Sequence, residues 1–204
     1  MDLLALAIAR EFRDVDTGRA IGTLDALGAE LARRAGDTSG APEEIARACS
    51  ELLAAQNGFR GDRDNYDDPD NSMLDLVLTT RRGLPILLSV VYIEVSRRAG
   101  IPIHGVGLPG HFVVAHFGAD PPLLLDPFDR GAVISAPAAH ESLQPSRPHE
   151  IAMRMLNNLV ASYRRRADLT AAIRAATMRL TLPAAPSLET TLKAELRALQ
   201  ARLN

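Results

Sequence analysis

The fold is decided in residues 85–126, which read PILLSVVYIEVSRRAGIPIHGVGLPGHFVVAHFGADPPLLLD. Residues 85–99 are apolar on most sides, begin with a proline and end in arginines before Gly100, which predicts a buried central helix. Beyond Gly100 the apolar residues change from helical spacing toward alternation, and glycine and proline interrupt them. We expect a strand followed by an antiparallel hairpin there, so this stretch predicts an α+β fold.

The chain before this stretch is predicted to be mainly helical. Residues 1–57 are rich in Ala, Leu and Arg at helical spacing, and Pro42 opens a third helix that should end near Asn57. Residues 58–72 hold five aspartates and many turn formers but no aliphatic run, so we expect a loop. A short helix should follow the loop and stop at Gly83.

The chain after the hairpin changes character twice. Pro127 to Pro148 is rich in turn formers, and the residues from His149 onward return to helical spacing. We therefore predict an N-terminal helical region (1–57), a mixed core (58–146) and C-terminal helices (147–204) that could form a tetratricopeptide-like unit. The last region carries ten Lys and Arg against four Asp and Glu but lacks a series of aromatics interleaved with the arginines, which favours a solvated helical face over an RNA-binding patch.

Composition and charge exclude several classes of protein. The 204 residues have a formal net charge of −2, which creates no overall field to attract nucleic acid or an anionic membrane. No apolar run reaches the roughly 20 residues of a membrane-spanning helix, and Asp2 stands where a secretory signal would carry positive charge. The single cysteine, Cys49, excludes an internal disulfide. We expect a cytoplasmic protein with no nucleic-acid or membrane partner.

The histidines do not show the spacing of a metal site. His104, His111 and His116 lie close in sequence, but the last two should face opposite sides of a continuous strand. The chain also lacks the phosphate-binding and dinucleotide-binding glycine motifs and the nucleophilic-serine motif. We therefore expect no metal and no other cofactor.

The aspartate-rich loop is predicted to be structural. It lacks the glycine and the final glutamate that an EF-hand calcium loop requires. Asp67, Asp68 and Asp70 should instead accept hydrogen bonds from backbone N–H groups, or pair with arginines such as Arg81 and Arg82. A loose calcium site stays an alternative.

Two residues stand out for chemistry. His111 follows a Pro-Gly turn at the start of one β-rich run, and Asp126 ends the next run. These ends of an antiparallel hairpin lie near each other, so Asp126 could orient the imidazole of His111 for general-base catalysis. The alternative is a half-buried structural histidine beside an aspartate that caps the turn before Pro127. The pattern alone favours the structural role.

Residues 71–131 combine LVLTTRRGLPILLSVVYIEV with AGIPIHGVGLPGHFVVAHF and LLLDPFDRG. Related motifs continue upstream through NGFRGDRDNYDDPDNS and downstream into RMLNNLVASYRRRADLTAAI. This run resembles the bacterial SirB-type branch of the transglutaminase-like superfamily. The resemblance implies a papain-like α+β core, in which a central helix packs on a small antiparallel sheet. It also implies helices before the core and tetratricopeptide-like helices after it.

Active transglutaminase-like enzymes carry a Cys-His-Asp triad, with the cysteine at the N-terminus of the central helix, where the helix dipole lowers its pKa. The Gly-Ile-Pro motif at residues 100–102 aligns with that of the family. This alignment places His111 on the triad histidine and Asp126 on the triad aspartate. It places Pro85, which has no nucleophilic group, at the cysteine position.

Two residues come into question as replacements for the missing thiol. Cys49 lies in an upstream helix and does not match the family motif. Ser89 follows Pro85 by one helical turn and is the nearby hydroxyl on the same helical face. We expect its hydroxyl to bond a backbone carbonyl of the helix, with a role as nucleophile as the alternative.

These observations lead to two hypotheses of function. The first is a degenerate transglutaminase-like domain that acts as a protein-binding or regulatory module, with another protein or a peptide as its partner. The second is a hydrolase or acyltransferase that uses His111 and Asp126 with Ser89 or water as the nucleophile. A third possibility is a peptide-binding module that uses the former substrate cleft without chemistry.

Overall fold

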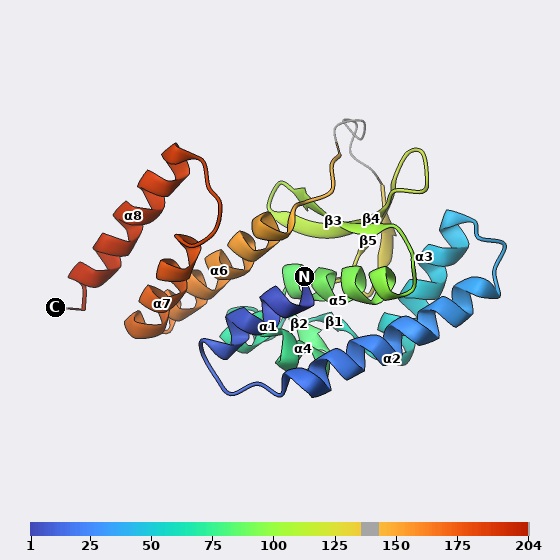
Figure 1. The fold of residues 1–204 in the computed structure, drawn as a ribbon, viewed down its shortest axis with the longest axis horizontal. Coiled ribbons are helices and arrows are strands. Elements are labelled where there is room, and N and C mark those ends of the chain that lie inside the picture. Colours follow the sequence, from blue (N-terminus) through green and yellow to red (C-terminus); the bar gives the residue numbers. More distant parts are fainter. Residues whose placement is uncertain (136–142, 204) are drawn as a thin grey trace.

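The computed structural model describes residues 1–135 and 143–203 (Figure 1). The α-helices within these ranges are α1 (Asp2–Arg10), α2 (Thr17–Gly36), α3 (Pro42–Ser50), α4 (Leu74–Thr80), α5 (Pro85–Arg98), α6 (Pro148–Arg165), α7 (Leu169–Arg179) and α8 (Pro186–Ala201). The strands are β1 (Arg60–Gly61), β2 (Arg82–Gly83), β3 (Ile103–Leu108), β4 (His111–His116), β5 (Leu123–Asp126) and β6 (Ala132–Ile134). The middle of the turn-rich stretch predicted between β5 and α6 lies outside the described residues.

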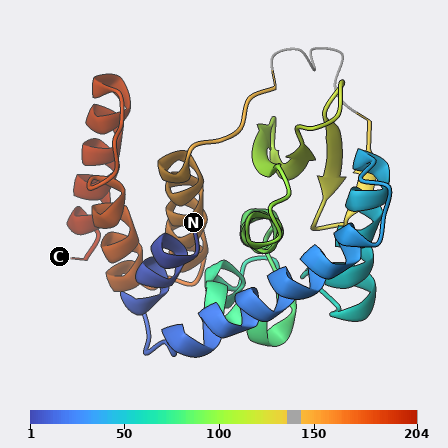
Figure 2. The same ribbon diagram turned by 45° about the vertical axis from the view of Figure 1, so that its right-hand side comes forward.

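Helix α5 lies at the centre of the molecule, between the four-stranded sheet and helix α2 (Figures 1 and 2). Every residue of α5 from Pro85 to Ser96 is buried. A helix that is apolar on all sides is stable in water only where other elements cover all its sides. The α+β fold with a buried central helix is therefore confirmed.

The sheet has the order β3-β4-β5-β6, and each neighbouring pair is antiparallel. Leu108 pairs with His111, so Pro109 and Gly110 alone form the turn between β3 and β4. Gly110 has a φ of +70°, which glycine adopts without the steric cost of a side chain. The predicted hairpin is present, and β6 is added to it. Strand β6 has only three residues, too few to show a strand period in a stretch predicted as turns.

Helix α2 crosses α5 at Gly28. A Cβ atom added to Gly28 would lie 2.4 Å from Cβ of Arg98, which is closer than side chains pack. Arg98 extends from this crossing to Asp25 of α2 (2.5 Å) and to Glu94 of α5 (2.8 Å). The side chain of Glu94 is 1% exposed, and Arg97 donates a second charge-assisted hydrogen bond to it. These arginines offset the cost of burying the carboxylate.

The aspartate-rich loop pairs with helix α6. Asp67 lies 2.5 Å from Arg165 and Asp68 lies 3.0 Å from Arg166. Asp68 also accepts a hydrogen bond from the backbone N–H of Asp70, as predicted. These contacts fasten the C-terminal end of α6 to the core.

The arginines predicted as partners of Asp67, Asp68 and Asp70 lie elsewhere, so that part of the prediction is wrong. Arg82 is 3.6 Å from Asp62, and Arg81 lies over the ring of Phe59 at 4.6 Å. Arg81 has a φ of +63° and ends α4, so its side chain turns toward Phe59.

The third helix also departs from its prediction. It is α-helical only as far as Ser50, and residues 51–56 form a π-helix before Asn57. The predicted end near Asn57 is correct. Both kinds of helix satisfy similar apolar spacing over one or two turns, so the sequence does not separate them.

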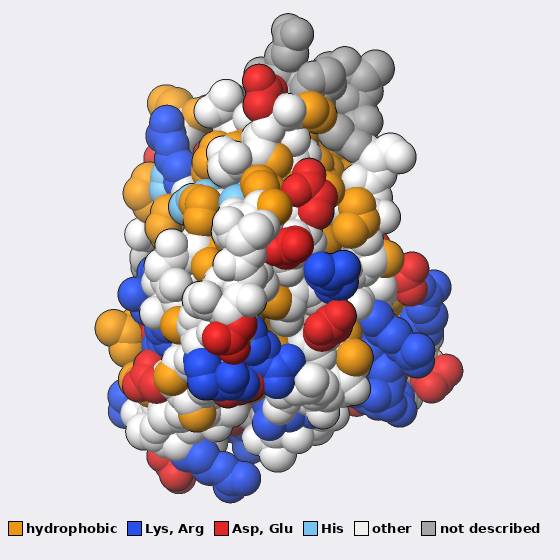
Figure 3. Space-filling model, turned by 90° about the vertical axis from the view of Figure 1, so that its right-hand side faces the viewer, with side chains coloured by type: hydrophobic (Ala, Val, Ile, Leu, Met, Phe, Trp, Pro, Cys, Tyr) orange, Lys and Arg blue, Asp and Glu red, His pale blue; other side chains and the backbone are white. Residues whose placement is uncertain are grey.

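Helices α6, α7 and α8 form an array at one end of the molecule (Figures 1 and 2). Figure 3 shows the opposite end, where acidic and basic side chains are interspersed over the lower half of the face.

None of the helices in the described part of the chain is both long enough and apolar enough to cross a membrane.

The crossing of α2 over α5 predicts opposite effects for two glycines of the same helix. Gly28→Ala should lower the free energy of unfolding by about 1–3 kcal/mol, because its new methyl group meets Arg98. Gly22→Ala is the matched control. Gly22 has nothing within 4 Å of an added Cβ, so alanine should raise the free energy of unfolding by about 0.5–1 kcal/mol. Urea unfolding measures both free energies. Equal changes in the two variants would contradict the close approach of α2 and α5 at Gly28.

Candidate active site

His111 and Asp126 meet where two neighbouring strands end. His111 begins β4 and Asp126 ends β5, and the register puts them on a diagonal of one sheet face. Nε2 of His111 lies 2.8 Å from Oδ2 of Asp126. In the neutral imidazole, an Nε2–H that donates to the carboxylate leaves Nδ1 as an acceptor. The hairpin thus brings the two residues together as expected, and their catalytic role stays a prediction.

Asp126 is held by its own loop as well as by His111. Its Oδ1 accepts hydrogen bonds from the backbone N–H groups of Phe128 (2.9 Å) and Asp129 (3.4 Å). Its backbone oxygen accepts from the N–H of Gly131 at 2.7 Å. The aspartate therefore caps the turn after β5, which is the structural role that the sequence favoured.

The loop after Asp126 is anchored to the short strand β1. The N–H of Gly61 donates to the carbonyl of Phe128 at 2.9 Å. A Cβ atom on Gly61 would lie 2.5 Å from the ring of Phe128, so only glycine lets the ring pack there. Tyr66 meets the same ring edge-on, with ring centres 5.9 Å apart. Tyr66 in turn lines the same cavity as His111.

A cavity of about 210 Å³ opens beside His111. Pro85 and Ile86, in the first turn of α5, line it together with the histidine. The N-terminus of the central helix thus faces the imidazole, which is the arrangement that the resemblance implies. The rest of the lining comes from the aspartate-rich loop, the β3–β4 turn, β4 and α6: Tyr66, Gly110, Phe112, Arg154, Asn157 and Asn158.

The cysteine and the serine considered as nucleophiles both lie outside this cavity. Cys49 is fully buried, with its Sγ 3.8 Å from Oγ of Ser96, and burial raises the pKa of its thiol to about 12. Ser89 is also fully buried. The prediction that Ser89 bonds a backbone carbonyl is wrong, because its Oγ has no hydrogen-bond partner among the described residues. Packing around α5 thus leaves the hydroxyl buried without a hydrogen-bond partner among the described residues.

The other histidines of the hairpin have separate surroundings. His104 is exposed and contacts the ring of Phe117. His116 is buried, accepts a hydrogen bond from the N–H of Gly118, and has its pKa lowered by desolvation. Across residues 1–135 and 143–203, no three His, Cys, Asp or Glu side chains gather in a way that could hold a metal ion.

Sequence reasoning missed the contribution of α6 to the cavity. Arg154, Asn157 and Asn158 come from a helix more than forty residues after His111 in the chain. The sequence signal was the motif RMLNNL, which extends the family resemblance into this helix. Helical spacing alone marks these residues as a polar face and does not say which surface they meet.

A central helix whose N-terminus faces a histidine–aspartate pair on an antiparallel sheet defines a papain-like domain of the transglutaminase type. The chain belongs to the transglutaminase-like superfamily, because the model of that family matches residues 19–162. This match spans parts of all three regions predicted from the sequence. The division into those regions, and the SirB-type branch within the superfamily, stay predictions.

Curated relatives match the chain over about half its length. The UPF0162 protein of Xylella fastidiosa (strain 9a5c) is 43% identical over 98 residues, which cover 48% of this chain and 35% of that protein. The UPF0162 protein of Vibrio cholerae is 32% identical over 85 residues, or 41% of this chain and 31% of that protein. F-box only protein 21 of Mus musculus is 34% identical over 104 residues, or 48% of this chain and 17% of that protein. No solved structure matches the chain significantly.

The hydrogen bonds of Asp126 predict unequal roles in stability for the two residues of the pair. Asp126→Ala should lower the free energy of unfolding by about 2–3 kcal/mol, because backbone N–H groups lose their acceptor. His111→Ala should cost less than about 1 kcal/mol, since its side chain is 32% exposed and the loop keeps Asp126 in place. Chemical unfolding of both variants tests this, and a larger loss in His111→Ala would contradict it.

Proposed function

We propose that this chain is a non-catalytic transglutaminase-like domain that binds a segment of another protein in the cleft beside His111. The observation that carries this proposal is the position of Pro85. It occupies the first turn of α5 and lines the same cavity as His111, where an active enzyme of this type would hold its thiol. Proline suits this position structurally, because the N–H that it lacks has no partner in the first turn of a helix.

The other candidate nucleophiles support the same conclusion. Thiol chemistry needs a thiolate within hydrogen-bond reach of the base. Cys49 is buried away from the cavity with a pKa of about 12. Ser89 is enclosed one turn inside α5 and does not line the cavity. The domain therefore keeps the framework of the site without a group that could form an acyl intermediate.

The 2.8 Å contact between His111 and Asp126 favours a second candidate function. His111 could remove a proton from a water molecule that attacks an acyl carbon, with Asp126 orienting the imidazole. This would make the chain a hydrolase without a covalent intermediate. The hydrogen bonds of Asp126 to its own loop account for its presence without catalysis, so we rank this function second.

Activity assays separate the two functions. The protein should neither incorporate amines into glutamine-donor peptides nor hydrolyse peptides and esters, and Cys49→Ser should behave in the same way. Mass spectrometry of the reaction mixtures measures both activities. Turnover that is lost in His111→Ala would establish the hydrolase instead. Turnover by the wild type that is lost in Cys49→Ser would show that the Cys49 thiol reacts, and would contradict the conclusion that it is buried and inert.

Restoring a thiol tests whether Pro85 occupies the former nucleophile position. In a Cys49→Ser background, Pro85→Cys should react with iodoacetamide at neutral pH about tenfold faster than an unfolded thiol. The helix N-terminus and His111 both favour the thiolate there, so adding His111→Ala should slow the reaction.

Ser89→Cys in the same background is the matched control. This thiol would lie one turn deeper in α5, where the native side chain is fully buried, and should stay unreactive until urea unfolds the protein. If the Pro85→Cys thiol reacts at the same rate with and without His111→Ala, the two positions do not form one site.

A further inference from the structure

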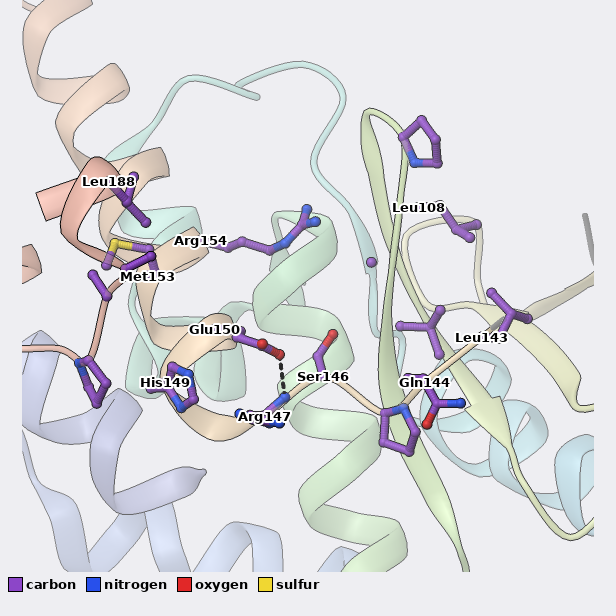
Figure 4. A pocket seen from close by; sticks show the side chains of 17 residues that line it. Leu108, Leu143, Gln144, Ser146, Arg147, His149, Glu150, Met153, Arg154 and Leu188 are labelled. Carbon is purple, nitrogen blue, oxygen red and sulfur yellow. Dashed lines mark hydrogen bonds between the residues drawn. The ribbon is translucent and has the colours of Figure 1, made fainter. Parts of the chain in front are cut away.

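We propose that an extended acidic segment of a partner protein docks in a groove next to the His111 cavity, with Gly107 bonding its backbone and Arg154 its carboxylate. This inference rests on the proposed binding function and names the chemistry of the bound segment. The groove has a volume of about 960 Å³ and runs between β3, the start of α6 and the start of α8. Figure 4 shows Arg154 reaching from α6 across this groove toward β3.

Strand β3 is one of the two edge strands of the sheet, and its outer edge is partly unpaired. The carbonyl of Gly105 accepts a hydrogen bond from the N–H of Ser146 at 2.8 Å, so Gly105 turns its peptide groups away from β4. Residues two apart on an antiparallel strand turn the same way. Gly107 therefore directs its N–H and carbonyl into the groove, and no backbone group of the described residues bonds either one. Such a residue can pair with an extended peptide.

Arg154 links the groove to the His111 cavity, because it lines both. A Cβ atom on Gly107 would lie 2.6 Å from Nη2 of Arg154, so the glycine provides the space for the guanidinium. The guanidinium also lies over the ring of Phe112, 5.5 Å from its centre. Arg154 makes no ion pair with any described residue, so its charge is available to an acidic ligand.

The remaining lining fits an acidic segment with apolar side chains. Arg147 adds a second positive charge to the groove. The carboxylate of Glu150 accepts a hydrogen bond from the backbone N–H of Arg147 at 2.7 Å (Figure 4). Apolar contacts come from Leu108 on β3 and from Leu188 on α8, which is 41% exposed. An extended peptide places successive side chains on opposite sides, so acidic and apolar residues in alternation match the two kinds of surface.

Peptide binding tests the inference directly. The probe is a fluorescein-labelled ten-residue peptide that alternates Glu with Val, and its counterpart carries Gln in place of Glu. Fluorescence anisotropy should show that the Glu peptide binds the full chain about tenfold more tightly than the Gln peptide. Arg154→Gln should remove this preference and leave the affinity for the Gln peptide within about twofold. Arg165→Gln, which changes another arginine of α6 outside the groove, should leave the preference intact.

Nuclear magnetic resonance adds a readout of position. The amide signal of Gly107 should shift when the Glu peptide saturates the protein, because that N–H gains a hydrogen bond. An unmoved Gly107 signal, equal binding of the two peptides, or no binding up to about 1 mM would each overturn the inference. Displacement of the peptide by a short single-stranded RNA of higher affinity would also overturn it, since the groove would then prefer phosphates.

These outcomes are distinct from a failure of the proposed function. Mass spectrometry of the same samples reports whether the peptide stays intact. Cleavage that depends on His111 would overturn the non-catalytic proposal, whatever the role of Arg154. If the peptide stays intact, and its binding neither depends on Arg154 nor shifts the Gly107 signal, only the docking site in the groove would be overturned.

Discussion

The burial of helix α5 is the constraint on which the rest of the structure depends. The helix is mostly apolar and is buried from Pro85 to Ser96, so it needs the sheet on one side and α2 on the other. Gly28 lets α2 approach closely enough to cover it, and Arg98 joins the two helices to the carboxylate of Glu94. The position of α5 in turn sets where its first turn lies. That placement puts Pro85 and Ile86 in the lining of the cavity beside His111.

The same residues serve the fold and the site. Asp126 accepts hydrogen bonds from the loop after β5 and also holds His111, and Pro85 begins the central helix and also lines the cavity. The hydrogen bonds of Asp126 and the glycine at position 61 hold the loop in place, and they do so whether or not the site is catalytic.

Helix α6 connects the core with the C-terminal array. Its final turn carries the arginines that pair with the aspartate-rich loop, and its first half lines both the His111 cavity and the groove beside β3. The C-terminal region carries an excess of positive charge, and part of that charge neutralises the acidic core. Arg154 lies apart from these pairs, at the junction of the two cavities, which is the reason to assign it to a ligand.

The sequence by itself determined the buried helix, the hairpin and, through its resemblance to a family, the meeting of His111 and Asp126 and the position of Pro85 at the start of the central helix. These features depend on spacing within a short stretch or on a motif, both of which are visible in the chain. Only the tertiary structure decided that Asp67 and Asp68 pair with α6, that Ser89 lacks a hydrogen-bond partner, and that Arg154 lies between two cavities. The physical reason is that such contacts join residues far apart in sequence, and the chain pattern says which face of a helix is polar but not what that face meets.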